Sequence, residues 1–411
     1  MYPILKGLRI VEGASFIAAP SCALHLHQLG ADVIRFDAIG GGPDFHRWPR
    51  IEDGPSLYWE GLNKGKKSIA LDLRRPEGRE LAVRLATAPG ENAGLVVTNF
   101  PVRGFFSHEN LKAQREDIIT VRVMGWFDGT TALDYTVNAA VGVPYMTGPQ
   151  SLEDAPVNHV LPAWDLVTGT YAAMALLAAE RHRRLSGEGS EIRVPLGDVA
   201  FATMGHLGQI AEVMHSGADR PRLGNDLFGA FGRDFVTGDG QRIMLVALTS
   251  RQWTGLVKVL GLGEAVRAVE REIGASLSDD EGLRFAHRER LNALVATALG
   301  SRRLDELKPE FDANGVCWGP YHTLQQALES DDSGTLASPL FESVQHPSGL
   351  RYPTPGASAT FEGRSRAGIQ PAPRLGEHTD QILAEVLDLP EHEIARLHDQ
   401  GLVAGAEENQ R

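Results

Sequence analysis

The sequence is poor in the features that mark several large protein classes. It has only two cysteines in 411 residues, Cys22 and Cys317, which excludes a disulfide framework and a cysteine-based metal cluster. It has no apolar run approaching the roughly 18 residues that a membrane-spanning helix needs. Positive charge is not in excess either, because 40 Lys and Arg stand against 53 Asp and Glu, a net charge of −13. We therefore expect a cytoplasmic protein without membrane or nucleic-acid partners.

Several catalytic and cofactor motifs are also missing. There is no H-E-x-x-H and no cluster of His, Cys and carboxylates, so no metal site is predicted. A G-x-S-x-G elbow, which would favour a serine hydrolase, is missing. The segment after the first predicted strand, Gly13–Pro20, reads GASFIAAP and not G-x-G-x-x-G. This argues against a nicotinamide cofactor, although Asp37 closes the second strand as in a dinucleotide-binding fold.

The chain does contain a regular alternation of strand and helix patterns over about its first 200 residues. A helical pattern at Pro20–Gly30 begins with Pro and ends with Gly. A longer, Ala-rich helix is predicted over Leu166–Arg184. This alternation predicts an α/β fold with a mostly parallel sheet covered by helices. The predicted strands are Leu8–Glu12, Asp32–Asp37, Ser68–Leu73, Gly94–Asn99, Asp117–Met124 and Glu191–Pro195.

The pattern changes beyond about residue 200. Helical stretches dominate, including Phe201–Met214 and Arg284–Ala298, and a hairpin-like pair of strands is expected near Phe235–Val246. This region is interpreted as a second domain. Around Ser333–Arg374 the chain is rich in Pro, Gly and Ser.

Asp165 is the main candidate for chemistry. It stands in VLPAWDLVTG (Val160–Gly169), at the beginning of the long Ala-rich helix. An aspartate in this position commonly caps free backbone N–H groups. It could instead be a carboxylate nucleophile at the edge of an apolar site. His159 lies close enough in the sequence to serve the same site, although a structural histidine is the more common case.

Basic residues form a second feature. They surround the predicted strand Ser68–Leu73, or lie in or after the strand Asp32–Asp37. They are either a solvated charged surface or an electrostatic cradle for phosphates, because ligands of α/β sheets bind at strand ends. The residues concerned are Arg35, Arg47, Lys64, Lys66, Lys67, Arg74 and Arg75.

Four segments, in order, resemble the class III CoA-transferase family, the type that includes formyl-CoA and carnitine CoA-transferases. The resemblance implies a Rossmann-like large domain built from residues 1–200 and 331–411. It also implies a smaller α+β domain at 201–330 and an interlocked homodimer. The segments are LKGLRIVEGASFIAAP (Leu5–Pro20), NKGKKSIALDLRRPEGRE (Asn63–Glu80), DYTVNAAVGVPYMTG (Asp134–Gly148) and RLGEHTDQIL (Arg374–Leu383).

The same resemblance assigns expected roles. It makes Asp165 the nucleophile, which would form an acyl anhydride and then an aspartyl-CoA thioester. No metal is implied, and no cofactor beyond the CoA moiety of the substrate. Arg103 would replace a basic residue that the family places near Ser107. The CoA-binding residues expected from the resemblance are Ile17, Ala18, Ala19, Arg47, Leu71, Arg74, Asn99, Phe100 and Arg103. Candidates for holding a free carboxylate are Tyr135, Asn225 and Arg233.

A narrower similarity suggests the reaction. The segments Ile34–Pro49, Ile119–Gly129, Val157–Asp165 and Gly224–Phe235 are similar to family members that move CoA between the two carboxyl groups of one mesaconate. The expected activity is therefore intramolecular transfer, with mesaconyl-CoA as substrate.

Other functions compete with this one. The first is intermolecular CoA transfer between an acyl-CoA and a free acid. A racemase of the same family would need a histidine base where Leu133 stands. A non-catalytic CoA-binding protein and a nicotinamide-dependent oxidoreductase are further alternatives.

Overall fold

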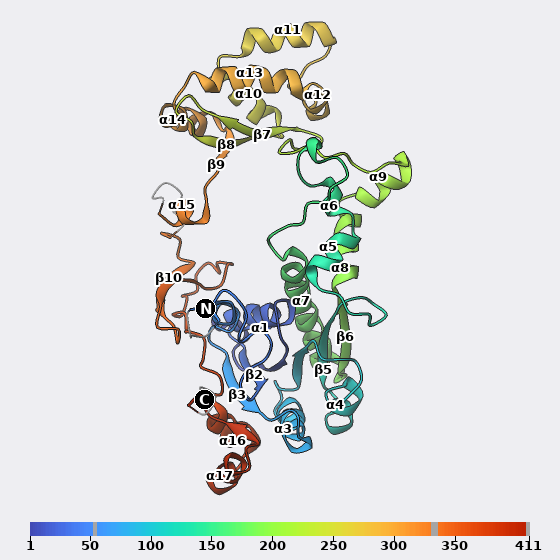
Figure 1. Ribbon diagram of the computed structural model, residues 1–411, viewed down its shortest axis with the longest axis vertical. Helices are drawn as coiled ribbons and strands as arrows, with labels where there is room; N and C mark the ends of the chain where they lie inside the picture. The colour runs from blue at the N-terminus through green and yellow to red at the C-terminus, as the bar shows by residue number, and fades with distance from the viewer. Residues whose placement is uncertain (52–55, 330–335, 408–411) are drawn as a thin grey trace. The chain divides into compact units, whose positions relative to one another are not determined.

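The computed structural model describes residues 1–51, 56–329 and 336–407, and its contacts divide the chain into two compact units (Figure 1). The first unit comprises Met1–Val141, His159–Glu212 and Leu336–Arg411. The second comprises Gly142–Asn158 and Val213–Thr335.

A seven-stranded sheet forms the centre of the first unit, in the order β12-β3-β2-β1-β4-β5-β6. Every neighbouring pair is parallel except β12 with β3. The sequence alternation therefore predicted the mixed α/β class and the dominant parallel sheet correctly. The strand order reverses between β1 and β4, where open α/β sheets bind ligands. The strands are β1 (Arg9–Gly13), β2 (Asp32–Ala38), β3 (Lys67–Leu71), β4 (Leu95–Thr98), β5 (Ile119–Met124), β6 (Ser190–Pro195) and β12 (Val403–Ala404).

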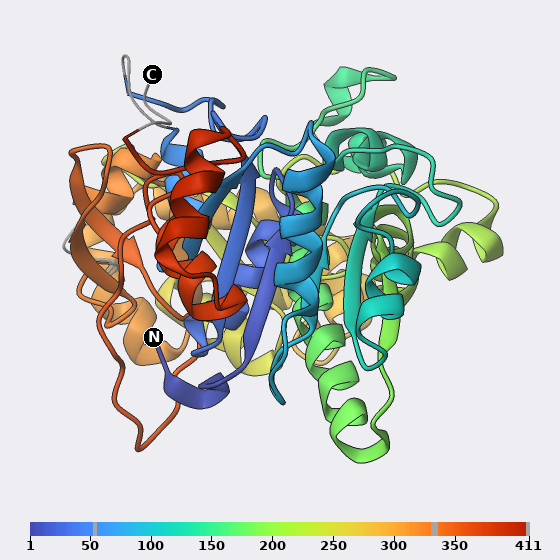
Figure 2. The ribbon, with the colours of Figure 1, turned by 90° about the horizontal axis from the view of Figure 1, so that it is seen from below.

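Helices cover both faces of this sheet (Figures 1 and 2). One face carries α1 (Ala18–Gln28) and α7 (Ala163–Ser186), which pack against each other. The other face carries α3 (Pro76–Thr87), α4 (His108–Gln114), α16 (Thr379–Leu387) and α17 (Glu391–Asp399). The unit also contains η1 (Pro3–Leu5), α2 (Leu57–Leu62), α5 (Asp134–Ala140), α8 (Leu196–His206) and the antiparallel pair β10 (Phe341–Gln345) and β11 (Arg351–Pro355).

The contact of α1 with α7 depends on a glycine. A Cβ built on Gly169 of α7 would lie 2.0 Å from Oγ of Ser21 and 2.6 Å from the carbonyl oxygen of Ala18. No side chain fits that space, so glycine is required for the two helices to approach this closely. The contact fixes the first turns of α7 beside the beginning of α1.

The second unit is built on the antiparallel sheet β7-β8-β9. Its core is formed by the sheet and the helices that follow, with Phe231, Leu245, Trp253 and Phe311 at most 2% exposed. The elements are α6 (Val143–Met146), η2 (Gln150–Leu152), β7 (Phe231–Val236), β8 (Arg242–Ala247), α10 (Ser250–Val259), α11 (Gly263–Ile273), α12 (Glu281–Ala286), α13 (Arg288–Gly300), α14 (Leu304–Asn314), β9 (Cys317–Pro320) and α15 (Leu324–Glu329). Helix α9 (Gln209–Ser216) crosses from the first range of residues to the second.

Two local expectations were wrong. The helix expected over Phe201–Met214 is two helices, because Gly208 adopts φ 75° between α8 and α9. The helix expected over Arg284–Ala298 is divided at His287 into α12 and α13. Of the stretch Ser333–Arg374, residues 333–335 lie outside the described residues. The remainder contains the β10–β11 pair, in which Pro353 and Pro355 stand opposite Ser343 and Phe341.

Three of the cations predicted for a charged surface or a phosphate cradle are buried, namely Arg35, Lys64 and Lys66. Arg35 and Lys66 are 1% and 2% exposed, and both bind the carboxylate of Glu12. Neither a solvated turn nor a phosphate cradle describes them, because burial of a charge requires a charged partner inside the protein.

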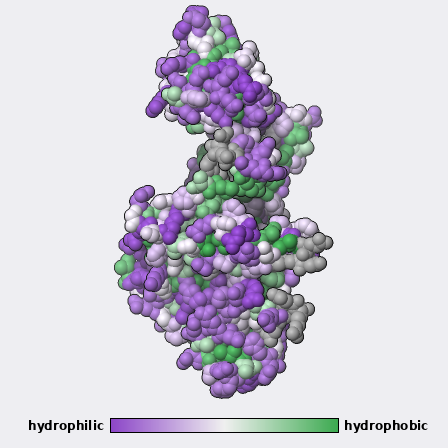
Figure 3. Space-filling view, turned by 90° about the vertical axis from the view of Figure 1, so that its left-hand side faces the viewer, coloured by the Kyte–Doolittle hydropathy of each residue, from purple (hydrophilic) through white to green (hydrophobic). Residues whose placement is uncertain are grey.

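The surface is rich in polar and charged residues, as the composition predicts. One face of the molecule is mainly hydrophilic, with apolar residues in small patches (Figure 3). Across the described residues, no helix is both long and apolar enough to cross a membrane.

Candidate active site

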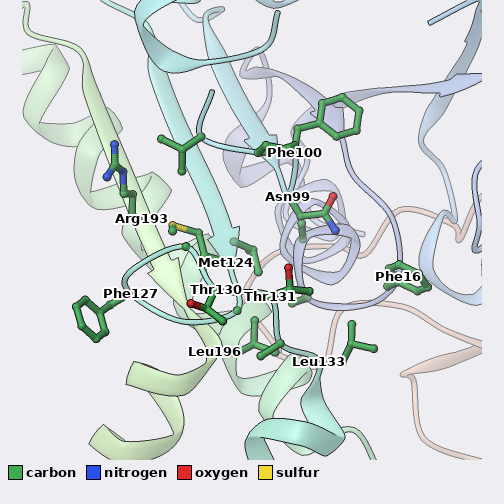
Figure 4. Close-up of a pocket in the computed structure, with 18 of the residues that line it drawn as sticks. Phe16, Asn99, Phe100, Met124, Phe127, Thr130, Thr131, Leu133, Arg193 and Leu196 are labelled. Carbon is green, nitrogen blue, oxygen red and sulfur yellow. The ribbon is translucent and has the colours of Figure 1, made fainter. Parts of the chain in front are cut away.

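A pocket of about 760 Å³ lies in the first unit at the carboxyl ends of the parallel strands (Figure 4). Its walls come from three loops, which follow β1, β4 and β5, from the end of β5 and the middle of β6, and from the beginnings of α1, α7 and α8. Because β1 and β4 are neighbours at the reversal of strand order, their loops meet there. The lining residues are Ser15–Ala19, Asn99–Arg103, Val123–Gly125, Phe127–Leu133, Asp165, Arg193 and Leu196.

Asp165 reaches the pocket from the first turn of α7. The helix begins after Pro162, which provides no side-chain cap. Within the described residues, the carboxylate of Asp165 accepts no hydrogen bond. It is therefore not a cap of its own helix and is available for chemistry.

A different carboxylate caps α7. Oδ2 of Asp134 accepts hydrogen bonds from the backbone N–H of Trp164 at 2.7 Å and of Asp165 at 3.1 Å. Its Oδ1 lies 2.6 Å from Nε2 of His159. The indole N–H of Trp164 donates to Asn138 at 3.1 Å, one turn further along α5. Side chains of α5 thus hold the backbone that carries Asp165.

The environment of Asp165 makes its carboxyl group an unusually weak acid. Burial, and then the negative charge of Asp134, raise the pKa of Asp165 from its ordinary value to about 7, against the opposing effect of the Arg47 cation. A desolvated carboxylate of raised pKa is a better nucleophile than one in water. Perturbed carboxyl groups in clefts are typical of catalytic sites.

The pocket wall next to Asp165 is held by side chains from other loops. Asn99 clamps the peptide groups of Ser15: its Oδ1 accepts from the Ser15 N–H at 3.2 Å, and its Nδ2 donates to the Ser15 carbonyl at 2.9 Å. Phe16 follows with φ 71°, a left-handed conformation rare outside glycine. Asn99 is therefore a support of this wall as well as part of the lining.

The structure brings most of the predicted CoA-binding residues to this pocket. Six of them line it with Asp165: Ile17, Ala18, Ala19, Asn99, Phe100 and Arg103. Arg47 is exposed outside the lining, yet close enough for its charge to act on Asp165. Arg74 is exposed beyond β3, and the side chain of Leu71 is fully buried in the core.

The candidates for the free carboxylate are divided between the units. Tyr135 is in the first unit, 39% exposed, and its ring contacts that of His159. Asn225 and Arg233 are in the second unit, where Asn225 bonds to Asp234, and Nε of Arg233 lies 3.6 Å from Asp226.

Sequence reasoning missed three contributors to the site. Asp134 enters the sequence analysis only as the first residue of the segment Asp134–Gly148, and its capping role depends on a contact 30 residues away. Arg193 sits mid-strand in β6 and enters the lining from there, paired with Glu191 at 2.8 Å. The loop Phe127–Leu133 carries Thr130 and Thr131, which Figure 4 shows at the pocket. The one sequence signal that could have identified Asp134 is an acidic residue in the first turn of a helix, where α5 begins.

The fold and the site are those of an α/β enzyme with a carboxylate in a pocket at the carboxyl ends of its strands. The sequence pattern of CoA-transferase family III matches residues 5–379, and the chain belongs to that family. Family membership supports an acyl-CoA as substrate.

Particular relatives narrow the comparison. The chain is 52% identical over 406 residues to 2-methylfumaryl-CoA isomerase of Chloroflexus aurantiacus, covering 98% of this chain and 99% of the relative. It is 27% identical to succinyl-CoA--D-citramalate CoA-transferase of the same organism, covering 96% of each. The crystal structure of a CAIB/BAIF family protein from Brucella suis superimposes with a TM-score of 0.75 at 25% identity, covering 94% of this chain and all of that one.

Proposed function

We propose that this protein interconverts the two CoA thioesters of mesaconate, 2-methylfumaryl-CoA and 3-methylfumaryl-CoA, by intramolecular CoA transfer. One observation carries the proposal: the pocket presents a carboxylate, Asp165, that is desolvated and has no hydrogen-bond partner among the described residues. The 52% identity to an enzyme named for this isomerisation supports the choice of substrate.

The first half of the reaction moves CoA from substrate to protein. A carboxylate oxygen of Asp165 attacks the thioester carbonyl at carbon 1, and the carbon–sulfur bond breaks to release CoA thiolate. The product is a mixed anhydride of Asp165 and mesaconate. The thiolate then attacks the Asp165 carbonyl of this anhydride, which gives an aspartyl-CoA thioester and free mesaconate.

The second half reverses these steps at the other end of mesaconate. Its carbon-4 carboxylate attacks the aspartyl thioester, expels CoA thiolate and forms a new anhydride. The thiolate then attacks carbon 4, so that Asp165 leaves as a carboxylate. Each step exchanges one activated acyl group for another, so the sequence needs no net proton, electron or energy source.

The site residues would serve this sequence in two ways. Arg103 and the loops of Ile17–Ala19 and Asn99–Phe100 would hold CoA, with Arg47 and Arg74 as further contacts. Leu71 is left out of this role because it is fully buried in the core. Tyr135, which belongs to the same unit as Asp165, would hold the free carboxylate while mesaconate turns. Retention of mesaconate and exclusion of water are essential because the anhydride hydrolyses.

The proposal includes a homodimer. Helix α7 exposes Val167, Tyr171 and Met174 at 42%, 51% and 58%. Their spacing puts them on one face of the helix. An apolar stripe of this kind is typical of a protein interface. Sedimentation of the purified protein tests this part separately.

The direct test is incubation of the protein with 2-methylfumaryl-CoA alone. We expect 3-methylfumaryl-CoA to accumulate without added acid. When ¹³C-labelled mesaconate is present, the thioester pool should stay unlabelled. Rapid labelling would favour the alternative, an intermolecular CoA transferase that uses the same aspartate.

The nucleophile is tested by substitution and trapping. Asp165→Ala should lower the rate by at least about 10³-fold, and hydroxylamine should convert Asp165 to its hydroxamate only in the presence of substrate. Asp198→Ala is the matched control, since Asp198 is an exposed acid in the first turn of α8. Near-normal activity of Asp165→Ala would eliminate covalent catalysis at this residue.

A further inference from the structure

We propose that Asp44 is a positioning residue of the active site, which fastens the Phe16 wall of the pocket and the loop of Arg47 to the buried guanidinium of Arg35. Asp44 lies in the loop after β2, is 1% exposed and does not line the pocket. The inference rests on the proposed function, because it concerns the site that contains Asp165.

Asp44 joins two parts of the molecule through one carboxylate. Its Oδ2 accepts the backbone N–H of Phe16 at 3.2 Å, and the same oxygen accepts NH2 of Arg35 at 3.0 Å. Arg35 is itself held by the sheet, since it donates to both oxygens of Asp37 at 2.8 Å and to Glu12 at 2.9 Å. Asp44 therefore connects the pocket wall at Phe16 to a side chain that the sheet holds in place.

The bond to Phe16 acts where the backbone needs support. Phe16 holds φ 71°, which a residue with a Cβ adopts only when its surroundings compensate for the strain. Asn99 holds Ser15 on one side, and the Phe16 N–H is bound by Asp44. Without the hydrogen bond to Asp44, we expect the strained backbone of Phe16 to relax to an extended conformation. This change would displace Ile17, the N-cap residue of α1.

The same loop carries Arg47. The backbone N–H of Arg47 donates to the Asp44 carbonyl at 3.3 Å. The Arg47 guanidinium lies 5.9 Å from the Phe16 ring centre and 5.5 Å from that of Tyr58. The loops approach closely, since a Cβ built on Gly42 would lie 3.2 Å from Asp44 and 3.3 Å from Ser15. The wall, Arg47 and Asp44 thus form one packed group beside Asp165.

Charge neutralisation of Arg35 does not by itself explain Asp44. The buried network contains two cations, Arg35 and Lys66, and already has two other carboxylates, Glu12 and Asp37. The third carboxylate leaves an excess of negative charge. What distinguishes Asp44 from Asp37 is its bond to the pocket wall.

The experiment compares Asp44→Asn with Asp37→Asn. Both substitutions remove one negative charge beside Arg35, but only the first weakens the hold on Phe16. We measure kcat and KM for 2-methylfumaryl-CoA, the dissociation constant of free CoA, and thermal unfolding. We expect Asp44→Asn to raise KM and the CoA dissociation constant at least tenfold over Asp37→Asn at similar Tm, with a smaller change in kcat.

The alternatives give distinct results. Equal kinetic constants for the two folded variants, or losses that follow the unfolded fraction, would overturn the proposal. If Asp44→Asn does not fold, Asp44→Glu keeps the charge facing Arg35 but moves the carboxylate by one methylene, and the same rise in KM is expected. If the wild type isomerises nothing, the proposed function fails, whereas the CoA dissociation constants still decide the role of Asp44.

Discussion

The backbone N–H of Asp165 donates a hydrogen bond of 3.1 Å to the side chain of Asp134. Two carboxylates thus lie at the beginning of one helix and have different roles, one structural and one proposed to be chemical. Asp134 is 2% exposed, fixed by His159 and two backbone amides, and serves the helix. Asp165 is left without such partners among the described residues and faces the pocket.

This arrangement predicts the pH dependence of the reaction. Because Asp165 attacks only when ionised and its pKa is about 7, kcat/KM should rise with pH through about 7 and then level off. Asp134→Asn removes a negative charge that raises this pKa, so the acid limb should move to lower pH. Asp154→Asn, at an exposed position, should leave it unchanged. If the acid limb of kcat/KM lies at the same pH in Asp134→Asn as in the wild type, the assignment of that limb to Asp165 is wrong.

The raised pKa also predicts a conflict between stability and function. A carboxyl group with a higher pKa in the folded than in the unfolded state destabilises the fold as pH rises from about 4 to 7. Asp165→Asn removes this ionisation and should raise Tm at pH 8, while abolishing activity. At pH 4 and below, the two proteins should unfold at nearly the same temperature. A Tm at pH 8 no higher than that of the wild type would show that the folded state does not disfavour the charge.

Packing of the nucleophile's helix is tested at Gly169. Gly169→Ala forces a methyl group against Ser21 and Ala18, at 2.0 and 2.6 Å, and should destabilise the protein by about 1–3 kcal/mol. Gly205→Ala in α8 is the control, because its nearest neighbour would lie at 3.5 Å. There alanine should be neutral or gain up to about 1 kcal/mol from helix propensity. Thermal unfolding distinguishes the two.

CoA binding is tested at the exposed guanidinium of Arg103. If it meets a phosphate of CoA, Arg103→Gln should raise KM about tenfold with little change in kcat, and should reduce the salt dependence of KM. Arg193→Gln should have a smaller effect, since Glu191 already offsets its charge. Arg181→Gln, on the exposed surface of α7, serves as control. A KM for Arg103→Gln equal to that of this control would remove Arg103 from the binding site.

Much of the fold could be read from local patterns. Apolar strands such as Leu95–Thr98 and capped or Gly-terminated helices such as α1 depend on nearby residues only. The β10–β11 pair and the break at Gly208 were not predicted. Prolines are unusual in a paired strand, and a glycine inside a helical pattern does not show whether its φ is positive.

The sequence by itself determined the alternation of strands and helices, the net charge and the motifs that mark the family, because these are properties of neighbouring residues. Only the tertiary structure decided which charges are buried and which are free. In the sequence, Arg35 and Asp165 are both charged residues in or beside a predicted element, and no local pattern shows which of them is paired in the folded protein. Folding encloses Arg35 among three carboxylates and leaves Asp165 facing a pocket, its capping duty taken by Asp134. The cost of burying a charge depends on partners that are distant in the chain. Which carboxylate is left without a partner, and is available as the nucleophile, is therefore decided only when the folded chain brings those partners together.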